Sequence, residues 1–292
     1  MSLVKFLKYV GTFLSLVIFT TLSYAQETIP IQILKSGHIV IRAKVNGVEG
    51  NFLFDTGGGI TLLTKKFSEK VHGLNKQDGR FTGFRSTGER LDLDLYKVEK
   101  ITMGKWQINK PVISIIDADL ASFDGLISLN LFEKQPFTLD LKNKTLTFES
   151  PGSLAVKELN GKDIQLQVRK DRDKSIDIFT YVVLNENDTL QFSLDSGAGY
   201  NSFKINLRYL KNRDDTVKVK RFLKKSEFDP NYKTEYFITD TRKLSLKDFP
   251  EISVRNFKTR YSDLIYDGIA SINSLGNILT FDLDKERLII GN

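Results

Sequence analysis

Two aspartates occur in motifs that could do chemistry as a pair. Asp55 begins an Asp-Thr-Gly tripeptide, and about 140 residues later Asp195 begins an Asp-Ser-Gly tripeptide. Two carboxylates within hydrogen-bond reach cannot both ionise, so such a pair shares one proton and titrates as a unit. One member could then act as a base toward a water while the protonated member polarises a peptide carbonyl, without a metal or cofactor.

The residues that follow each aspartate fit this chemistry. Each motif comes after an apolar stretch that predicts a rigid strand, and the glycine permits a tight turn with close backbone approach. The hydroxyl of Thr56 or Ser196 is free to hydrogen-bond across to the partner motif. The alternative is that each tripeptide is only a turn that closes a strand, since Asp, Ser and Gly all favour turns.

An internal repeat gives the two motifs equivalent positions. Three blocks recur in the same order at a nearly constant offset: 51–59 as 191–199, 123–130 as 266–273, and 137–146 as 279–288. Self-similarity of this kind indicates a duplicated structural unit. We therefore predict two β-rich lobes, each carrying one aspartate.

The rest of the pattern predicts an all-β fold. From Ile31 onward, short apolar or alternating stretches are separated by turn signals, which is typical of a sandwich or barrel. Short helices are expected at 64–71 and 206–212, after each motif. We predict an N-terminal lobe over 26–150, a linker over 151–162 with loops around 150–153 and 160–161, and a C-terminal lobe over 163–292.

The first 25 residues predict a secretory signal peptide. Lys5 and Lys8 precede an apolar run over 10–22, and 23–25 (Ser-Tyr-Ala) offers small residues for cleavage before Gln26. A retained membrane anchor is the alternative. We expect an exported protein, periplasmic or secreted, with no stable membrane insertion after cleavage. The chain has no Cys, so it must be stable without disulfides and needs a sizeable core.

Charge and histidine content exclude other classes of function. The net charge is +7, and the densest basic run, 211–225, is interleaved with acids. That run predicts a solvated face, with a patch for an acidic partner or a membrane surface as the alternative, and no nucleic-acid module is recognisable. His38 and His72 are the only histidines, and neither lies in a metal-ligand pattern or near a G-x-S-x-G nucleophile motif.

The paired motifs and the repeat resemble the pepsin and retropepsin superfamily of aspartic proteases. They are most similar to the exported bacterial retropepsin-like proteins that have two lobes in one chain. The resemblance implies a duplicated pepsin-like acid-protease barrel with its active site in a cleft between the lobes. It also implies that Asp55 and Asp195 are the catalytic dyad. The dyad-supporting residues would be the hydroxyls of Thr56 and Ser196 and the turns at Gly57 and Gly197.

The resemblance further implies a substrate and a cover for it. An extended peptide or unfolded protein would bind in the cleft under a β-hairpin flap. The best flap candidate is 80–89, which contains Gly83, Phe84 and Gly88, with an ordinary hairpin as the alternative. We expect an aspartic endopeptidase that acts as a monomer and needs no metal or other cofactor.

Two features depart from the family pattern. Ser128 and Ser271 stand where the family has glycine behind the catalytic loop, and the second lobe lacks a glycine-rich flap. The first alternative is therefore a non-catalytic pepsin-like protein that holds a peptide, protein or glycan in the cleft. The second is a structural β-repeat unrelated to proteases, in which the two aspartates lie far apart.

Overall fold

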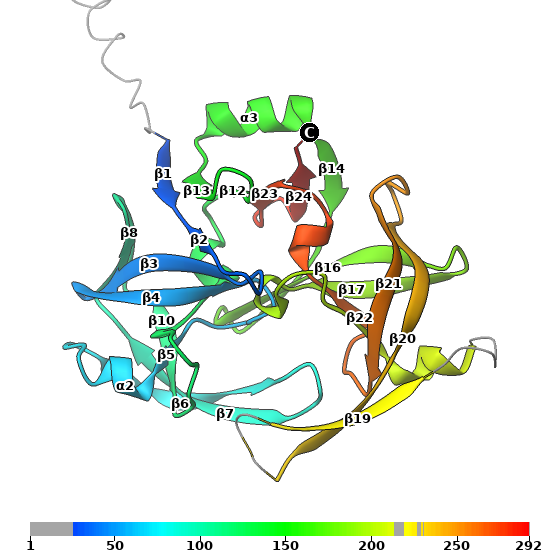
Figure 1. The fold of residues 1–292 in the computed structure, drawn as a ribbon. Helices are drawn as coiled ribbons and strands as arrows, with labels where there is room; N and C mark the ends of the chain where they lie inside the picture. The colour runs from blue at the N-terminus through cyan, green and yellow to red at the C-terminus, as the bar shows by residue number, and fades with distance from the viewer. Residues whose placement is uncertain (1–25, 213–218, 227–228, 230, 292) are drawn as a thin grey trace, which may run out of the picture.

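Three β-sheets build the molecule, one in each lobe and one shared between them (Figure 1). The computed structural model describes residues 26–212, 219–226, 229 and 231–291. The expected signal peptide over 1–25 and the centre of the basic run, 213–218, lie outside the described residues. No helix within the described ranges is long and apolar enough to cross a membrane.

The N-terminal lobe contains the ten-stranded sheet. Its order is β6-β7-β10-β5-β11-β4-β3-β8-β9, with β2 paired to β3. The strands are β2 (Gln32–Ile33), β3 (Ile39–Val45), β4 (Val48–Asp55), β5 (Leu62–Thr64), β6 (Asn75–Phe84), β7 (Arg90–Lys97), β8 (Lys100–Met103), β9 (Trp106–Asn109), β10 (Val112–Ile116) and β11 (Gly125–Ser128).

The C-terminal lobe contains the eight-stranded sheet. Its order is β15-β16-β17-β22-β18-β21-β20-β19. From β16 onward, each strand corresponds in turn to a strand of the first lobe in the order β3-β4-β11-β5-β10-β7-β6. The strands are β15 (Gln167–Asp171), β16 (Ser175–Leu184), β17 (Asp188–Leu194), β18 (Phe203–Asn206), β19 (Lys220–Lys225), β20 (Lys233–Leu246), β21 (Ser253–Ser262) and β22 (Gly268–Ala270). The all-β, two-lobed prediction is thus confirmed, and the sequence repeat corresponds to a repeated sheet order.

The shared sheet joins the lobes through antiparallel pairing of β12 with β23. Its order is β1-β13-β12-β23-β24-β14, from β1 (Glu27–Pro30), β12 (Phe137–Asp140), β13 (Thr145–Phe148), β14 (Lys162–Gln165), β23 (Ile278–Asp282) and β24 (Arg287–Ile290). Thr138 lies opposite Thr280, and their hydroxyls are 2.7 Å apart. These residues are equivalent in the repeat, so the pseudo-twofold axis that relates the lobes passes between them.

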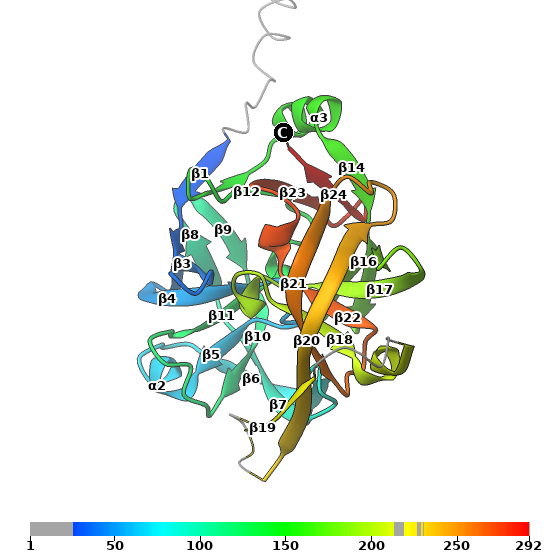
Figure 2. The same cartoon turned by 45° about the vertical axis from the view of Figure 1, so that its right-hand side comes forward.

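The helices are short, and one of them replaces the predicted linker loops. They are α2 (Lys65–Ser68), α3 (Pro151–Asn160) and the 3₁₀ turns η2 (Leu129–Phe132), η3 (Ser196–Ala198), η4 (Leu207–Asn212) and η5 (Ile272–Ser274). The prediction of loops around 150–153 was wrong, because Ser150 caps α3 and Pro151 occupies its first turn, both of which favour a helix start. Helix α3 lies against the shared sheet, away from the hairpins β6–β7 and β19–β20 (Figures 1 and 2).

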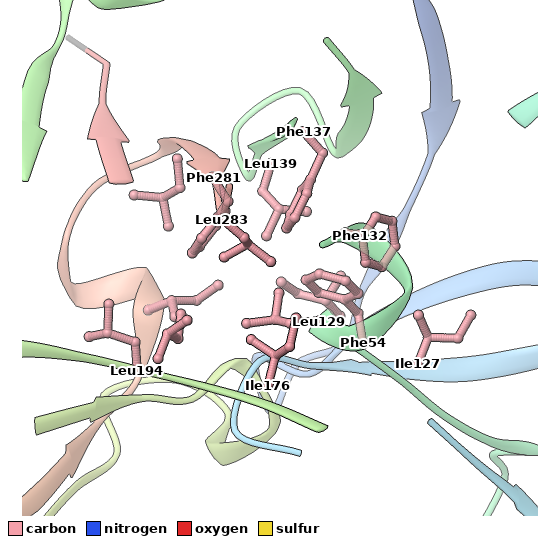
Figure 3. Close-up of a cluster of buried hydrophobic side chains, with 14 of the residues drawn as sticks. Phe54, Ile127, Leu129, Phe132, Phe137, Leu139, Ile176, Leu194, Phe281 and Leu283 are labelled. Atoms are coloured by element: carbon pink, nitrogen blue, oxygen red, sulfur yellow. The ribbon is translucent and has the colours of Figure 1, made fainter. Parts of the chain in front are cut away.

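Phenylalanine rings connect the strand before Asp55 to the shared sheet (Figure 3). Phe54 is fully buried, and its ring centroid lies 5.7 Å from those of Phe132 and Phe137. Phe137 in turn stacks on Phe281 of the other lobe at 5.0 Å. The core thus runs without a break from one lobe to the other and fixes the end of β4 against the centre of the molecule.

Candidate active site

Asp55 and Asp195 stand at the same place in their two lobes. Asp55 is the last residue of β4, and Asp195 directly follows β17. In β4 the residues Phe52 and Phe54 are buried, and in β17 Phe192 and Leu194 are buried. Alternate residues of a strand point to opposite faces, so each strand is held by its core side and delivers its aspartate into the loop that follows.

The two loops are joined by reciprocal hydrogen bonds across the lobes. The Thr56 hydroxyl donates to the Leu194 carbonyl at 2.7 Å and accepts from the Ser196 N–H at 2.9 Å. The Ser196 hydroxyl donates to the Phe54 carbonyl at 2.7 Å and accepts from the Thr56 N–H at 2.9 Å. Thr56 and Ser196 are buried, so water cannot compete for these four bonds.

The glycines of the motifs allow the carboxyl groups to approach the opposite loop. A Cβ atom on Gly57 would lie 2.6 Å from the Cγ of Asp195, and one on Gly197 would lie 2.6 Å from the Cγ of Asp55. Neither distance is possible between non-bonded carbons, so both positions require glycine. Each carboxyl group therefore packs on the backbone of the other loop.

The carboxyl group of Asp55 keeps its proton to an unusually high pH. Burial raises the pKa of Asp55 to about 7, helped by the negative charge of Asp195 and a hydrogen bond between the two carboxyl groups. Hydrogen bonds from the backbone N–H groups of Gly57 and Gly58 lower the pKa of Asp55 by a smaller amount. The Gly57 nitrogen lies 2.9 Å from Asp55 Oδ1. A bond between two carboxyl groups needs a proton on one of them, because two carboxylates only accept. Asp55 therefore keeps its proton up to about pH 7.

One oxygen of the pair has no hydrogen-bond donor among the described residues. The Oδ1 of Asp195 is buried, and apart from a proton shared with Asp55 it receives no hydrogen bond from the described part of the chain. A buried oxygen without a donor is costly unless water or a substrate group binds to it.

Ser128 and Ser271 are accommodated behind the loops. Ser128 lies opposite Asp55 in the pairing of β11 with β4, and its hydroxyl donates to Asn130 Oδ1 at 2.6 Å. Ser271 makes the same bond to Asn273, also at 2.6 Å. Both serines are buried, and their hydroxyls are satisfied. The sequence analysis did not single out Asn130 and Asn273, although they end the second repeated block.

His38 contacts the second motif, a role that the sequence analysis did not predict. Its Nε2 lies 3.1 Å from the Gly197 carbonyl, and its Nδ1 lies 2.7 Å from the Ser36 hydroxyl. Because a carbonyl only accepts, Nε2 is the donor in the first contact. The N–H of Tyr200 also donates to the Ser36 carbonyl at 2.8 Å. The segment before β3 thus positions the loop of the opposite lobe that carries Asp195.

The predicted flap residues lie in the hairpin of β6 and β7. Gly83 and Phe84 end β6, the Phe84 side chain is exposed, and Gly88 takes a left-handed φ of +82° in the connecting turn. The tip of this hairpin reaches the other lobe, where the Ile265 N–H donates to the Ser86 carbonyl at 2.9 Å.

The second lobe carries a hairpin without glycine at the equivalent place. Strands β19 and β20 pair in the position that β6 and β7 occupy in the first lobe (Figure 1). The Tyr232 hydroxyl donates to the Thr87 carbonyl at 2.5 Å, and the Ser226 hydroxyl donates to the Glu89 carboxylate at 2.7 Å. Glu89 also pairs with Arg85 at 3.0 Å. The two hairpin tips therefore contact each other.

The comparisons identify the first of these lobes. Residues 41–131 match a family model described as aspartyl protease, a segment that begins within β3 and includes Asp55 and the hairpin of β6 and β7. No curated protein sequence matches the chain. This match in the first lobe, together with the same sheet order in the second, supports the pepsin and retropepsin superfamily of aspartyl proteases.

Proposed function

We propose that this protein is an aspartic endopeptidase that hydrolyses peptide bonds with a water activated by Asp55 and Asp195. The observation that carries the proposal is that Asp55 and Asp195 stand at equivalent strand ends, with each carboxyl group packed against the glycine of the opposite loop. The raised pKa of Asp55, about 7, supports it, because this carboxyl group then keeps its proton beside the carboxylate of Asp195. A pair with one proton offers a base and an acid at the same point.

The proposed reaction uses both members of the pair. The ionised carboxylate takes a proton from the water, whose oxygen bonds to the peptide carbon. The protonated carboxyl group donates its proton to the carbonyl oxygen, so the tetrahedral intermediate forms without a net charge on the substrate. Transfer of a proton to the nitrogen then breaks the C–N bond and releases an acid and an amine. The cross-lobe hydrogen bonds of Thr56 and Ser196 favour this chemistry because they limit movement of the two carboxyl groups.

The proposed site of action is outside the cytoplasm. The basic, apolar and small-residue pattern of residues 1–25 supports export. Extended peptides or unfolded proteins are the proposed substrates, because the scissile bond must enter between the two lobes.

The test is cleavage of an unfolded protein by the purified chain and by its Asp55→Asn and Asp195→Asn variants. The wild type should cleave and each variant should lose at least about 10³-fold in rate, since neither can supply both a base and an acid. Asp117→Asn is the matched control, because Asp117 is an exposed loop acid paired with Lys65. Wild-type activity retained in both dyad variants would refute the mechanism, whereas an inert wild type that binds peptides would favour the non-catalytic alternative.

A further inference from the structure

Strand register shows which residues of the two lobes occupy equivalent places. In the first lobe Leu62 lies opposite Leu126 and beside Ser114. In the second lobe Lys204 lies opposite Ile269 and beside Arg260. Since Leu126 and Ile269 are equivalent in the repeat, Lys204 replaces Leu62 and Arg260 replaces Ser114.

The side of the site contributed by the first lobe is apolar. We name it the apolar wall, and its buried members are Ile60, Leu62, Phe81, Leu93, Leu95 and Ile116. Leu126 packs against this cluster. A Cβ atom on Gly58 would lie 3.2 Å from both Leu126 Cδ1 and Asp55 Oδ2, so the apolar wall adjoins the dyad.

The equivalent side in the second lobe is cationic. We name it the basic wall, and it consists of Lys204, Arg260 and Tyr236. By strand register, Tyr236 occupies the place in the second lobe that Leu93 occupies in the first. These three residues line a pocket of about 90 Å³ together with the hairpin residues Arg85 and Glu89. Phe203, the residue before Lys204, pairs with Ala270, which also pairs with Leu194, the residue before Asp195, so strand register brings the basic wall near the dyad.

The described residues that line this pocket carry more positive than negative charge. Of the pocket residues, five are cationic (Arg85, Lys204, Lys224, Lys225 and Arg260), and one, Glu89, is acidic. Glu89 is engaged by Arg85 and Ser226. Within the described residues, Lys204 and Arg260 form no ion pair with a carboxylate.

The geometry of the two cations suits an anionic group. The Arg260 guanidinium lies over the Tyr236 ring, 4.5 Å from its centroid, which limits its orientation. Burial lowers the pKa of Lys204 against the opposing effect of Asp195, and the charges of Arg260 and Arg85 lower it further. A carboxylate between Lys204 and Arg260 would offset this repulsion and accept charge-assisted hydrogen bonds.

Resting on the proposed function, we propose that the enzyme selects peptides with an acidic side chain on one side of the scissile bond and an apolar side chain on the other. The acidic side chain binds between Lys204 and Arg260. The apolar side chain contacts Leu126, the partly exposed residue that packs on the apolar wall beside Asp55. The pseudo-twofold axis relates the two walls, so they lie on opposite sides of the dyad.

The first test compares kcat/KM for peptides that differ only by Glu, Gln or Leu at the position next to the scissile bond, at about pH 5.5. Glu is ionised and the dyad holds its proton at this pH. The wild type should prefer Glu to Gln by about 10- to 100-fold on one side of the bond, the range expected for a hydrogen bond to a charged group. Wild-type cleavage with equal rates for Glu and Gln would overturn the inference while leaving the proposed function intact.

The matched variant is Lys204→Leu combined with Arg260→Ser, which installs the residues of the first lobe. Its Glu-to-Gln ratio should fall to about 1, and cleavage of the Leu peptide should be retained or increased. The ratio is measured within one variant, so a smaller folded fraction does not change it. Lys258→Gln, which alters an exposed lysine of β21 paired with Asp240, should keep the wild-type ratio. An unchanged ratio in the double variant would also overturn the inference.

A binding measurement separates this inference from the proposed function. Peptides with a reduced, non-cleavable bond are titrated into the wild-type chain by calorimetry. Tighter binding of the Glu peptide by a chain that cleaves nothing would support the basic wall and refute the peptidase. If no peptide binds and none is cleaved, both proposals fail.

Discussion

The hydroxyls of Thr56 and Ser196 each accept a hydrogen bond from the other residue's backbone N–H, at 2.9 Å in both directions. Each hydroxyl also donates to the carbonyl before the opposite aspartate, that of Leu194 or Phe54. Because the two residues are equivalent in the repeat, the pseudo-twofold axis passes between them as it does between Thr138 and Thr280. The dyad thus stands on a symmetric arrangement of four buried bonds.

Thr56→Val should destabilise the protein strongly. Valine keeps the shape but leaves the Ser196 N–H and the Leu194 carbonyl unpaired, at a cost of about 1–3 kcal/mol for each buried group. Thr56→Ser retains the hydroxyl and should cost less than half as much. Urea unfolding measures both, with Thr28→Val, at an exposed position on β1, as the control. Equal stability of the Val and Ser variants would contradict the role of these bonds.

Activity should fall as the pH rises through 7. Burial and the charge of Asp195 raise the pKa of Asp55 to about 7, so the pair loses its remaining proton above this pH. The value of kcat/KM should then decrease about tenfold for each further pH unit. A pH–rate profile with a neutral peptide substrate measures this, and constant activity up to pH 9 would refute the shared proton.

Asp55→Asn should stabilise the protein at high pH and have little effect at low pH. The folded wild type binds its proton up to about pH 7, while an unfolded Asp loses it near 4, so wild-type stability decreases between these values. Asn has no such penalty, and the free energy of unfolding of the variant should rise by on the order of 4 kcal/mol above pH 7. Urea unfolding of the wild type and the variant measures the difference between their free energies of unfolding. This difference should be near zero at pH 4 and large at pH 8.

Gly57→Ala and Gly197→Ala should each abolish cleavage. The added methyl group would lie 2.6 Å from the carboxyl carbon of Asp195 or Asp55, so the carboxyl groups must move apart. Gly152→Ala is the control, since its Cβ meets no atom within 4 Å and alanine favours helix α3. Initial rates on an unfolded protein report the effect, and an Ala variant with wild-type rate would contradict the close approach.

His38→Ala should lower kcat more than it raises KM. Within the described residues, His38 forms no hydrogen bond with a carboxyl group. Its Nε2 donates to the Gly197 carbonyl at 3.1 Å, so loss of the side chain should loosen the loop that carries Asp195. His72→Ala is the matched control. Comparison of kcat and KM for the two variants measures the effect, and equal kcat values would show that the His38 contact does not position the loop.

Tyr232→Phe should loosen the contact between the hairpin tips. The variant loses the hydroxyl that donates to the Thr87 carbonyl at 2.5 Å. Amide hydrogen exchange over 85–89 should accelerate several-fold, because this tip opens more often. Tyr181→Phe, at an exposed position on β16, should leave the exchange unchanged. Identical exchange in the wild type and Tyr232→Phe would show that the hydroxyl does not hold the tips together.

The sequence by itself determined the strand-rich class, the duplication and the two Asp-(Thr/Ser)-Gly motifs. These properties depend on residues close in the chain, namely the alternation of apolar residues, the turn formers and the glycine after each aspartate. The same local rules failed at Pro151, because Ser, Pro and Gly are common both in loops and at the start of a helix.

Only the tertiary structure decided what the motifs do together. The four bonds of Thr56 and Ser196, the contact of His38 with Gly197 and the meeting of the hairpin tips all join residues more than 130 positions apart. Their formation depends on how two separately folded sheets pack about one axis. The equivalence of Lys204 with Leu62 follows from strand register, which is set by pairing across each sheet. The chain order therefore supplied two carboxyl groups, and packing between the lobes made them a pair that shares one proton.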